Sequence, residues 1–230
     1  MTDTSRDEAT LLRHACERAL SDSRDSIHIP DGYRSVPLCA IDAIYSIGVR
    51  YEGVENVVER YRSYWRAQGV DANSSAHTTA QFLHEFGERD DLGSTLFGNR
   101  QLTSPRGGIP KADAVLRLLE MLGSCDFDIQ TTEQLRSHFK DEKLDAAIRS
   151  IHGQSSGISA KYLFLLAGVE DAIKPDRMIL RFVSGAVGRK VTPLEAQDLL
   201  VETVPDLKRA FPDVTPRLLD HVIWHSARGR

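Results

Sequence analysis

The sequence predicts an all-α protein with two helical lobes, and three observations carry this prediction. Alternation of Val, Ile and Thr is scarce, whereas apolar residues recur at the three- and four-residue spacing of amphipathic helices. Hydrophobic residues make up 41% of the chain and charged residues 27%, which is typical of soluble globular proteins. The 230 residues suffice for one large domain or for two small lobes that share a core.

Four helices are expected in the first part of the chain, each marked by apolar residues at helical spacing. They cover about residues 11–20, 37–47, 54–65 and 78–88. Their apolar positions include Leu11, Leu12, Ala15, Ala19 and Leu20, then Leu38, Ile41, Ile44 and Tyr45, then Val54, Val57, Val58, Tyr61, Tyr64 and Trp65, and finally Phe82, Leu83 and Phe86. A long polar loop, rich in glycine, is expected over residues 87–108.

Seven further helices are expected after this loop. Pro110 suits a first helical turn and Gly123 a helix end, whereas Thr131 and Gln134 have the spacing of a capping box. The expected ranges are about 110–122, 131–139, 143–151, 159–167, 176–187, 193–200 and 216–227. No strand hairpin, internal repeat or low-complexity tract interrupts this series.

Composition excludes several classes of protein. No run of 18 apolar residues exists, and the first residues lack the apolar stretch of a signal peptide, so we expect a cytoplasmic protein without a membrane span. Cys16, Cys39 and Cys125 are too few and too widely spaced for a disulfide framework, an iron–sulfur cluster or a zinc finger. His221 and His225 have helical metal-ligand spacing but no third ligand nearby, so no metal and no cofactor are expected.

The stretch from residue 144 to 183 contains the strongest functional signal. One short helix ends at Gly153, a Ser/Gly turn follows, and a second helix begins near Ser159, so the pattern is helix, hairpin, helix. Such a turn directs backbone N–H groups and the positive end of the second helix toward one point, where a DNA phosphate fits. Gly157 can adopt φ > 0 and would admit a phosphate closely. The alternative is an ordinary turn between two helices. The expected phosphate contacts are Gly153, Ser155, Ser156, Gly157 and Ser159.

Charge is distributed unevenly along the chain. Residues 149–190 hold seven Lys or Arg and three acidic residues, a net charge of +4 within a chain of net charge −4. A local basic face in an acidic protein favours a targeted phosphate contact over general binding of nucleic acid. A solvated helix face is the other interpretation of such a charge run.

These residues resemble the helix-hairpin-helix DNA glycosylase superfamily, which has the endonuclease III-like fold. Gly157-Ile158-Ser159-Ala160-Lys161 resembles the hairpin motif, and residues 174–181 (KPDRMILR) resemble the segment that carries the family's Asp. Residues 37–64 are similar to an early helix, the DNA-inserting loop and the next helix, and residues 108–112 (GIPKA) to the start of a later helix. The resemblance covers about residues 37–187, in the family's order.

The resemblance implies a middle lobe over residues 36–171 that ends in the helix-hairpin-helix (about 144–168). Residues 1–35 and 172–230 would form the second lobe, with DNA across the cleft between them. Ser159 replaces the second hairpin glycine, and 15 residues separate Lys161 from Asp176, fewer than in the relatives. The family's C-terminal iron–sulfur loop is absent.

Two residues are expected to carry the chemistry. The resemblance implies that Asp176 stabilises the positive charge that develops on deoxyribose and activates water. The alternative role for Asp176 is a helix cap. Lys161 lies where bifunctional relatives have a nucleophilic lysine, yet the altered spacing leads us to expect a phosphate contact and a monofunctional enzyme.

Further residues are assigned by the same resemblance. Arg50 and Tyr51 would fill the gap left by a flipped base, although a packed helix corner is an equal alternative. Asp42, Tyr45 and Gly48 would line the base pocket, where Gly48 leaves room for a bulky, hypermodified phage-type base. Alternatively, Tyr45 lies in the core and Asp42 in solvent. Lys111 and Arg177 are expected to contact DNA.

The sequence therefore predicts a DNA glycosylase that hydrolyses the N-glycosidic bond of a modified or damaged base and leaves an abasic site. Double-stranded DNA would be its partner, the enzyme would be a monomer, and its role would be repair or phage defence. A non-catalytic helix-hairpin-helix DNA-binding protein is one alternative, and a structural helical protein is another.

Overall fold

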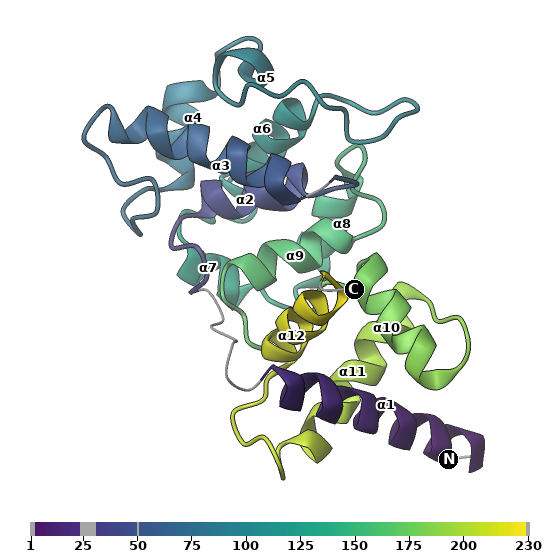
Figure 1. Cartoon of the computed structure of the whole chain (residues 1–230). Coiled ribbons are helices and arrows are strands. Elements are labelled where there is room, and N and C mark those ends of the chain that lie inside the picture. Colours follow the sequence, from purple (N-terminus) through teal and green to yellow (C-terminus); the bar gives the residue numbers. More distant parts are fainter. Residues whose placement is uncertain (1–2, 24–30, 50, 229–230) are drawn as a thin grey trace. The chain divides into compact units, whose positions relative to one another are not determined.

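The computed structural model describes residues 3–23, 31–49 and 51–228, and within them every regular element is a helix (Figure 1). The helices are α1 (Asp3–Asp22), α2 (Val36–Tyr45), α3 (Tyr51–Arg66), α4 (Thr79–Phe86), α5 (Leu92–Thr95), α6 (Lys111–Leu122), α7 (Thr132–Ser137), α8 (Glu142–Ser150), α9 (Ile158–Leu166), α10 (Arg177–Val187), α11 (Pro193–Leu207) and α12 (Pro216–Arg228). The all-α prediction is confirmed. None of the helices in these ranges is both long and apolar enough to cross a bilayer.

The chain divides into two compact units. Unit 1 combines Met1–Asp31 with Glu170–Arg230, and unit 2 is the continuous segment Gly32–Val169. These limits lie close to the lobe boundaries expected from the sequence. Each unit has a hydrophobic interior of its own.

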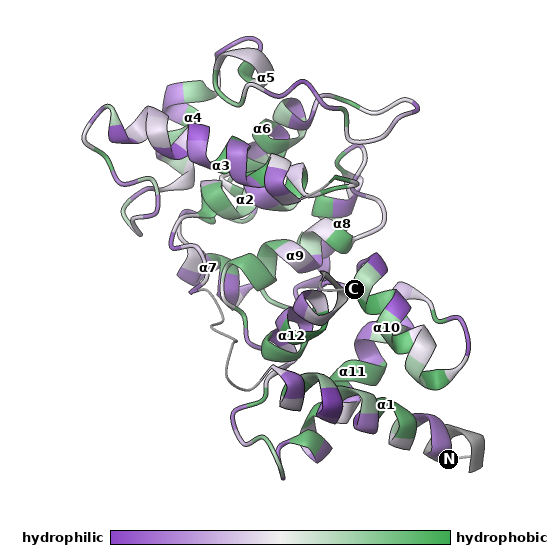
Figure 2. Cartoon of the chain, in the orientation of Figure 1, coloured by the Kyte–Doolittle hydropathy of each residue, from purple (hydrophilic) through white to green (hydrophobic). Residues whose placement is uncertain are grey.

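Unit 2 is built around α2, whose ten residues are all buried. Seven of the ten are Val, Leu, Cys, Ala or Ile, and Pro37 at the start of the helix favours helix initiation at this point. The helix α2 packs against α3, α6 and α9. The helix α9 is also strongly apolar, as the green ribbon of Figure 2 shows, because it is covered on several sides.

Unit 1 brings the first helix of the chain together with the last three. The helix α1 packs against α10, α11 and α12, and Figure 1 shows α1 beside α11. Apolar residues at helical spacing make the shared core, for example Leu12 and Cys16 of α1, Val183 of α10, Leu200 of α11 and Ile223 of α12.

Local signals place several helix ends as the sequence predicts. Thr131 and Gln134 form a capping box before α7, which confirms that prediction. The short helix α5 was missed inside the expected loop 87–108. Its N-cap, Asp91, has φ +51 and accepts a hydrogen bond from Ser94 N. A four-residue helix has no apolar periodicity from which it could have been predicted.

A buried aromatic cluster joins α3 and α4 in unit 2. The Tyr61 hydroxyl lies 2.6 Å from His77 Nε2, and Trp65 meets the imidazole edge to face with centroids 4.6 Å apart. Burial lowers the pKa of His77, which favours the neutral ring, and this ring shares one hydrogen bond with the phenol. No described group pairs with His77 Nδ1. The Tyr61 hydroxyl is therefore the one hydrogen-bond partner of this ring within the described residues.

Tyr61→Phe is expected to lower the free energy of unfolding by about 1–3 kcal/mol, because the buried Nε2 then loses its hydrogen-bond partner. Chemical denaturation in a Trp224→Phe background, followed by Trp65 fluorescence, measures this loss. Tyr64→Phe is the matched control, since the Tyr64 hydroxyl bonds to Glu85 at a partly exposed site. Equal, small losses in the two variants would contradict the prediction.

Candidate nucleic-acid interface

The helices α8 and α9 are joined by a short turn over residues 151–157. Asp141 caps α8 by accepting bonds from Lys143 N and Leu144 N. Two glycines shape the turn, because Gly153 has φ +86 and Gly157, the N-cap of α9, has φ +72. Residues with a side chain rarely adopt such angles. The glycines at these two positions therefore match the backbone that the turn requires.

Buried polar contacts hold the turn in place. Gln154 is fully buried, and its Oε1 accepts a hydrogen bond from the buried Ser159 hydroxyl. The Gln154 carbonyl accepts from Gly157 N at 3.0 Å. Gly153 lies against Thr103, so close that a Cβ at Gly153 would be 2.4 Å from Thr103 Oγ1. These contacts fix the turn against the loop that precedes α6.

The start of α9 offers unpaired donors. Within the described part of the chain, no acceptor pairs with the amide N–H groups of Ser159 and Ala160. Both groups lie in the first turn of a nine-residue helix, where the helix dipole is positive. Ser155 and Ser156 beside them are exposed. Ser159 is only 5% exposed and Ala160 is fully buried, so the solvent-facing part of the turn is Ser155 and Ser156.

Cationic side chains flank the turn. Lys161 is partly exposed one helical turn into α9. Arg149, which the sequence analysis did not select, donates from Nη2 to Ser156 O at 3.2 Å and pairs with Asp145 at 3.4 Å. A Cβ on Gly157 would lie 2.5 Å from Arg149 Nε. The guanidinium fills the space at Gly157, which corrects the expectation that a phosphate approaches there.

Lys111 does not face DNA, which corrects a second expectation. It is 1% exposed, and its Nζ donates to the carbonyl oxygens of Tyr45 at 2.9 Å and Ile47 at 2.8 Å. These carbonyls belong to the end of α2, which has no further helical turn to satisfy them. Burial lowers the pKa of Lys111 to about 8. The residue therefore fixes the turn after α2 from inside.

Asp42 is the centre of a buried cluster that the sequence did not reveal. It is fully buried, and its Oδ2 accepts from the Tyr33 hydroxyl at 2.8 Å and from the Tyr51 hydroxyl at 3.3 Å. Tyr162 of α9 also hydrogen-bonds to Asp42 and Tyr51. Burial, together with the Asp42 charge, raises the pKa of all three phenols, which therefore remain protonated donors. The cluster ties the segment before α2 to α3 and α9.

The turn after α2 differs from the expected inserting loop. The Tyr51 hydroxyl points to Asp42 in the interior, which corrects its assignment as a side chain that inserts into the base stack. Tyr45 is 1% exposed, and its ring packs against Phe97 with centroids 5.2 Å apart. It is therefore a core residue, which was the alternative to a role in the base pocket. Gly48 is exposed with φ +68. Arg50 lies outside the described residues.

Asp176 caps α10 in unit 1. Its Oδ1 accepts hydrogen bonds from Met178 N at 2.8 Å and Ile179 N at 3.3 Å. Its other oxygen, Oδ2, accepts none from the residues that the structure describes. The capping role is thus present, and the same geometry leaves one carboxylate oxygen for another partner. Arg177, the next residue, is exposed.

Within unit 1, a second carboxyl group lies near Asp176. Asp220 of α12 is 8% exposed, and its pKa is raised by burial and further by the charge of Asp176. Asp220 could not be found from the sequence, because 44 positions separate it from Asp176 and no local motif surrounds it. No cluster of three or more metal-ligating side chains occurs in the described ranges.

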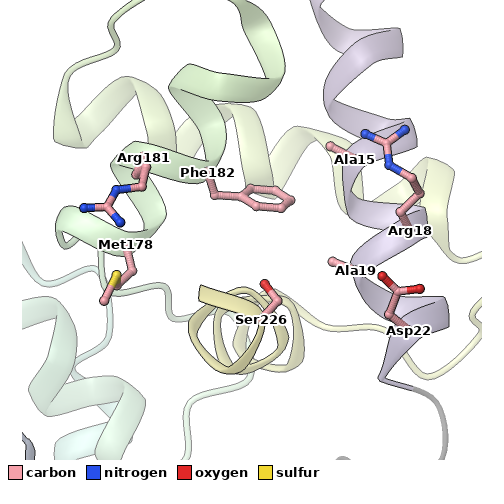
Figure 3. Close-up of a pocket in the computed structure, with 8 residues that line it drawn as sticks. All are labelled: Ala15, Arg18, Ala19, Asp22, Met178, Arg181, Phe182 and Ser226. Carbon is pink, nitrogen blue, oxygen red and sulfur yellow. The ribbon is translucent and has the colours of Figure 1, made fainter. Parts of the chain in front are cut away.

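A pocket of about 350 Å³ lies between α1, α10 and α12 of unit 1. Figure 3 shows Phe182 reaching from α10 toward α1, with Arg181 and Met178 on the α10 side and Arg18 and Asp22 on α1. The other lining residues are Ala15, Ala19 and Ser226. Its charges have both signs, so they select no single class of ligand.

The structure brings the predicted phosphate contacts of residues 153–161 together on one turn of unit 2, whereas Asp176 and Arg177 belong to unit 1.

A family model described as a domain of unknown function (DUF8548) matches residues 10–228. Comparisons with curated proteins and with solved structures gave no significant match. Because the family match spans both units, the chain belongs to the DUF8548 family.

Proposed function

We propose that the chain is a monomeric DNA glycosylase that binds double-stranded DNA and hydrolyses the N-glycosidic bond of a modified or damaged base. The glycine turn between α8 and α9, with the exposed Ser155 and Ser156 and the partly exposed Lys161 beside it, is the observation that carries the proposal. It supports a phosphate contact at this turn, which needs no particular base sequence. Repair and defence against phage DNA are the two roles open to such an enzyme.

Asp176 is proposed as the catalytic carboxylate. In hydrolysis the C1′–N bond breaks, the electron pair leaves with the base, and water supplies the new C1′–O bond and a proton. A carboxylate near C1′ stabilises the developing cation and accepts a proton from water. The hydrogen bonds from Met178 N and Ile179 N hold the Asp176 side chain in one orientation for this task.

The second candidate is a non-catalytic DNA-binding protein of the helix-hairpin-helix type. One observation favours it: capping of α10 by itself accounts for an aspartate at position 176. The two candidates make the same prediction for DNA binding and opposite predictions for product formation.

The purified chain should be incubated with duplexes and with genomic and phage DNAs that carry different modified bases. Abasic sites are measured by alkaline strand cleavage, and binding by mobility shift. Abasic sites on one modified substrate support the glycosylase. A shift without product on any substrate supports the binding protein, and loss of both, at low salt as well, contradicts both candidates.

Lys161 is expected to bind phosphate and not to form an imine with C1′. Borohydride should trap no covalent adduct, and Lys161→Ala should weaken DNA binding and reduce the slope of log K against log salt concentration by about one. Lys143→Ala is the matched control, because Lys143 is exposed at the far end of α8. An adduct that disappears in Lys161→Ala would make the enzyme bifunctional.

A further inference from the structure

Asp220 is a buried acidic residue that has no role in the reaction proposed above. It lies on α12 with 8% of its surface exposed. Its Oδ1 accepts a hydrogen bond from the backbone N–H of Lys174 at 2.8 Å. Lys174 precedes the proposed catalytic residue by two positions, so this bond connects α12 to the segment that presents Asp176.

The segment of residues 174–176 is held at both ends. Asp176 N donates to Lys174 O at 2.7 Å, which closes a tight turn around Pro175. Beyond the turn, the Asp176 side chain binds the first amides of α10. Proline fixes its own φ and offers no N–H. The Asp220 side chain therefore anchors the start of this segment.

The environment of Asp220 is unfavourable for a charge. Burial raises its pKa to about 7, the Lys174 N–H opposes this shift, and the charge of Asp176 adds to it. A leucine in this position would avoid the cost of burying a carboxyl group. The interaction with Asp176 also indicates that the two carboxyl groups are close enough to influence each other.

We propose that Asp220 is a positioning residue, which sets the orientation of the Asp176 carboxylate by holding the Lys174 N–H. The inference rests on the proposed glycosylase function. Asp220 does not touch the substrate. Displacement of a reacting group by about 1 Å can lower a rate by 10²-fold, so the loss of this anchor should act on the chemical step and not on DNA affinity.

The test compares wild type with Asp220→Asn and Asp220→Leu on a modified duplex that the wild type cleaves. Asparagine keeps an acceptor oxygen at the same length, whereas leucine has a similar volume and no acceptor. Single-turnover excision rate and DNA dissociation constant are measured separately. We expect Asp220→Asn to retain the rate within about threefold, and Asp220→Leu to lose at least about tenfold with an unchanged dissociation constant.

Val222→Ala is the control for a merely structural effect, since Val222 is a buried core residue of the same helix. It should lower the melting temperature without changing the rate of the folded protein. If Asp220→Leu does not fold, Asp220→Ser, whose hydroxyl is too short to reach Lys174 N, takes its place. Excision by the acceptor-free variant at the wild-type rate overturns the inference. Absence of excision by the wild type refutes the proposed function itself.

Discussion

Asp176→Asn is expected to lower the rate of base excision by about 10²- to 10⁴-fold while DNA binding stays intact or becomes tighter. Asparagine retains the shape of the side chain and is as good a helix cap as aspartate, so α10 should remain folded. What the amide lacks is the negative charge that stabilises the developing cation. Single-turnover kinetics and the dissociation constant of the same duplex measure the two effects.

The chain offers a matched control for this change in Asp141→Asn. Asp141 caps α8 through Lys143 N and Leu144 N, in the same way in which Asp176 caps α10. Replacement of this second cap should leave the excision rate unchanged. If Asp176→Asn were as active as wild type, Asp176 would be only a cap, and the proposed mechanism would be wrong.

Asp42→Ala is expected to lower the free energy of unfolding of unit 2 by at least about 3 kcal/mol, because the tyrosine hydroxyls lose a buried acceptor. The three donors come from Tyr33, Tyr51 and Tyr162, which lie in different segments. Chemical denaturation measures the loss. In a Trp224→Phe background, Trp65 is the remaining tryptophan and reports on unit 2 alone.

Asp42→Asn distinguishes the contribution of the acceptor oxygen to stability from that of the negative charge. The amide keeps one oxygen for the Tyr33 hydroxyl and should therefore lose less stability than the alanine variant. A further comparison with Tyr51→Phe removes one donor and leaves the carboxylate in place. If Asp42→Ala cost no more than Tyr51→Phe, the carboxylate would not be the centre of the cluster.

The helices could be predicted because their signals are local. The apolar spacing of α3 and the capping box at Thr131 depend on residues within a few positions of one another. The glycine turn at 153–157 has the same local character. The sequence therefore predicted the all-α class and the place of the candidate phosphate-binding turn.

The direction of side chains depends on partners far along the chain, and the sequence does not show it. Lys111 belongs to a motif that favours a DNA contact, but its ammonium group binds carbonyls 64 and 66 positions away. The acceptor of the Tyr51 hydroxyl is likewise set by tertiary packing. Asp220 could have been found only from the burial of its carboxyl group, which appears once α12 is folded against its neighbours.

Unit 1 is made from two segments that lie on either side of unit 2 in the chain, and this affects how the protein folds during synthesis. Its first helix leaves the ribosome before all of unit 2, whereas its partners α10, α11 and α12 follow unit 2 in the chain. Unit 2 is a continuous segment and can fold in between, but the apolar face of α1 must wait until α10, α11 and α12 have been synthesised. Contacts between such distant segments also form slowly, because a long loop must close first. Newly made chains should therefore expose Leu12 and Cys16 to chaperones until α10, α11 and α12 have emerged from the ribosome.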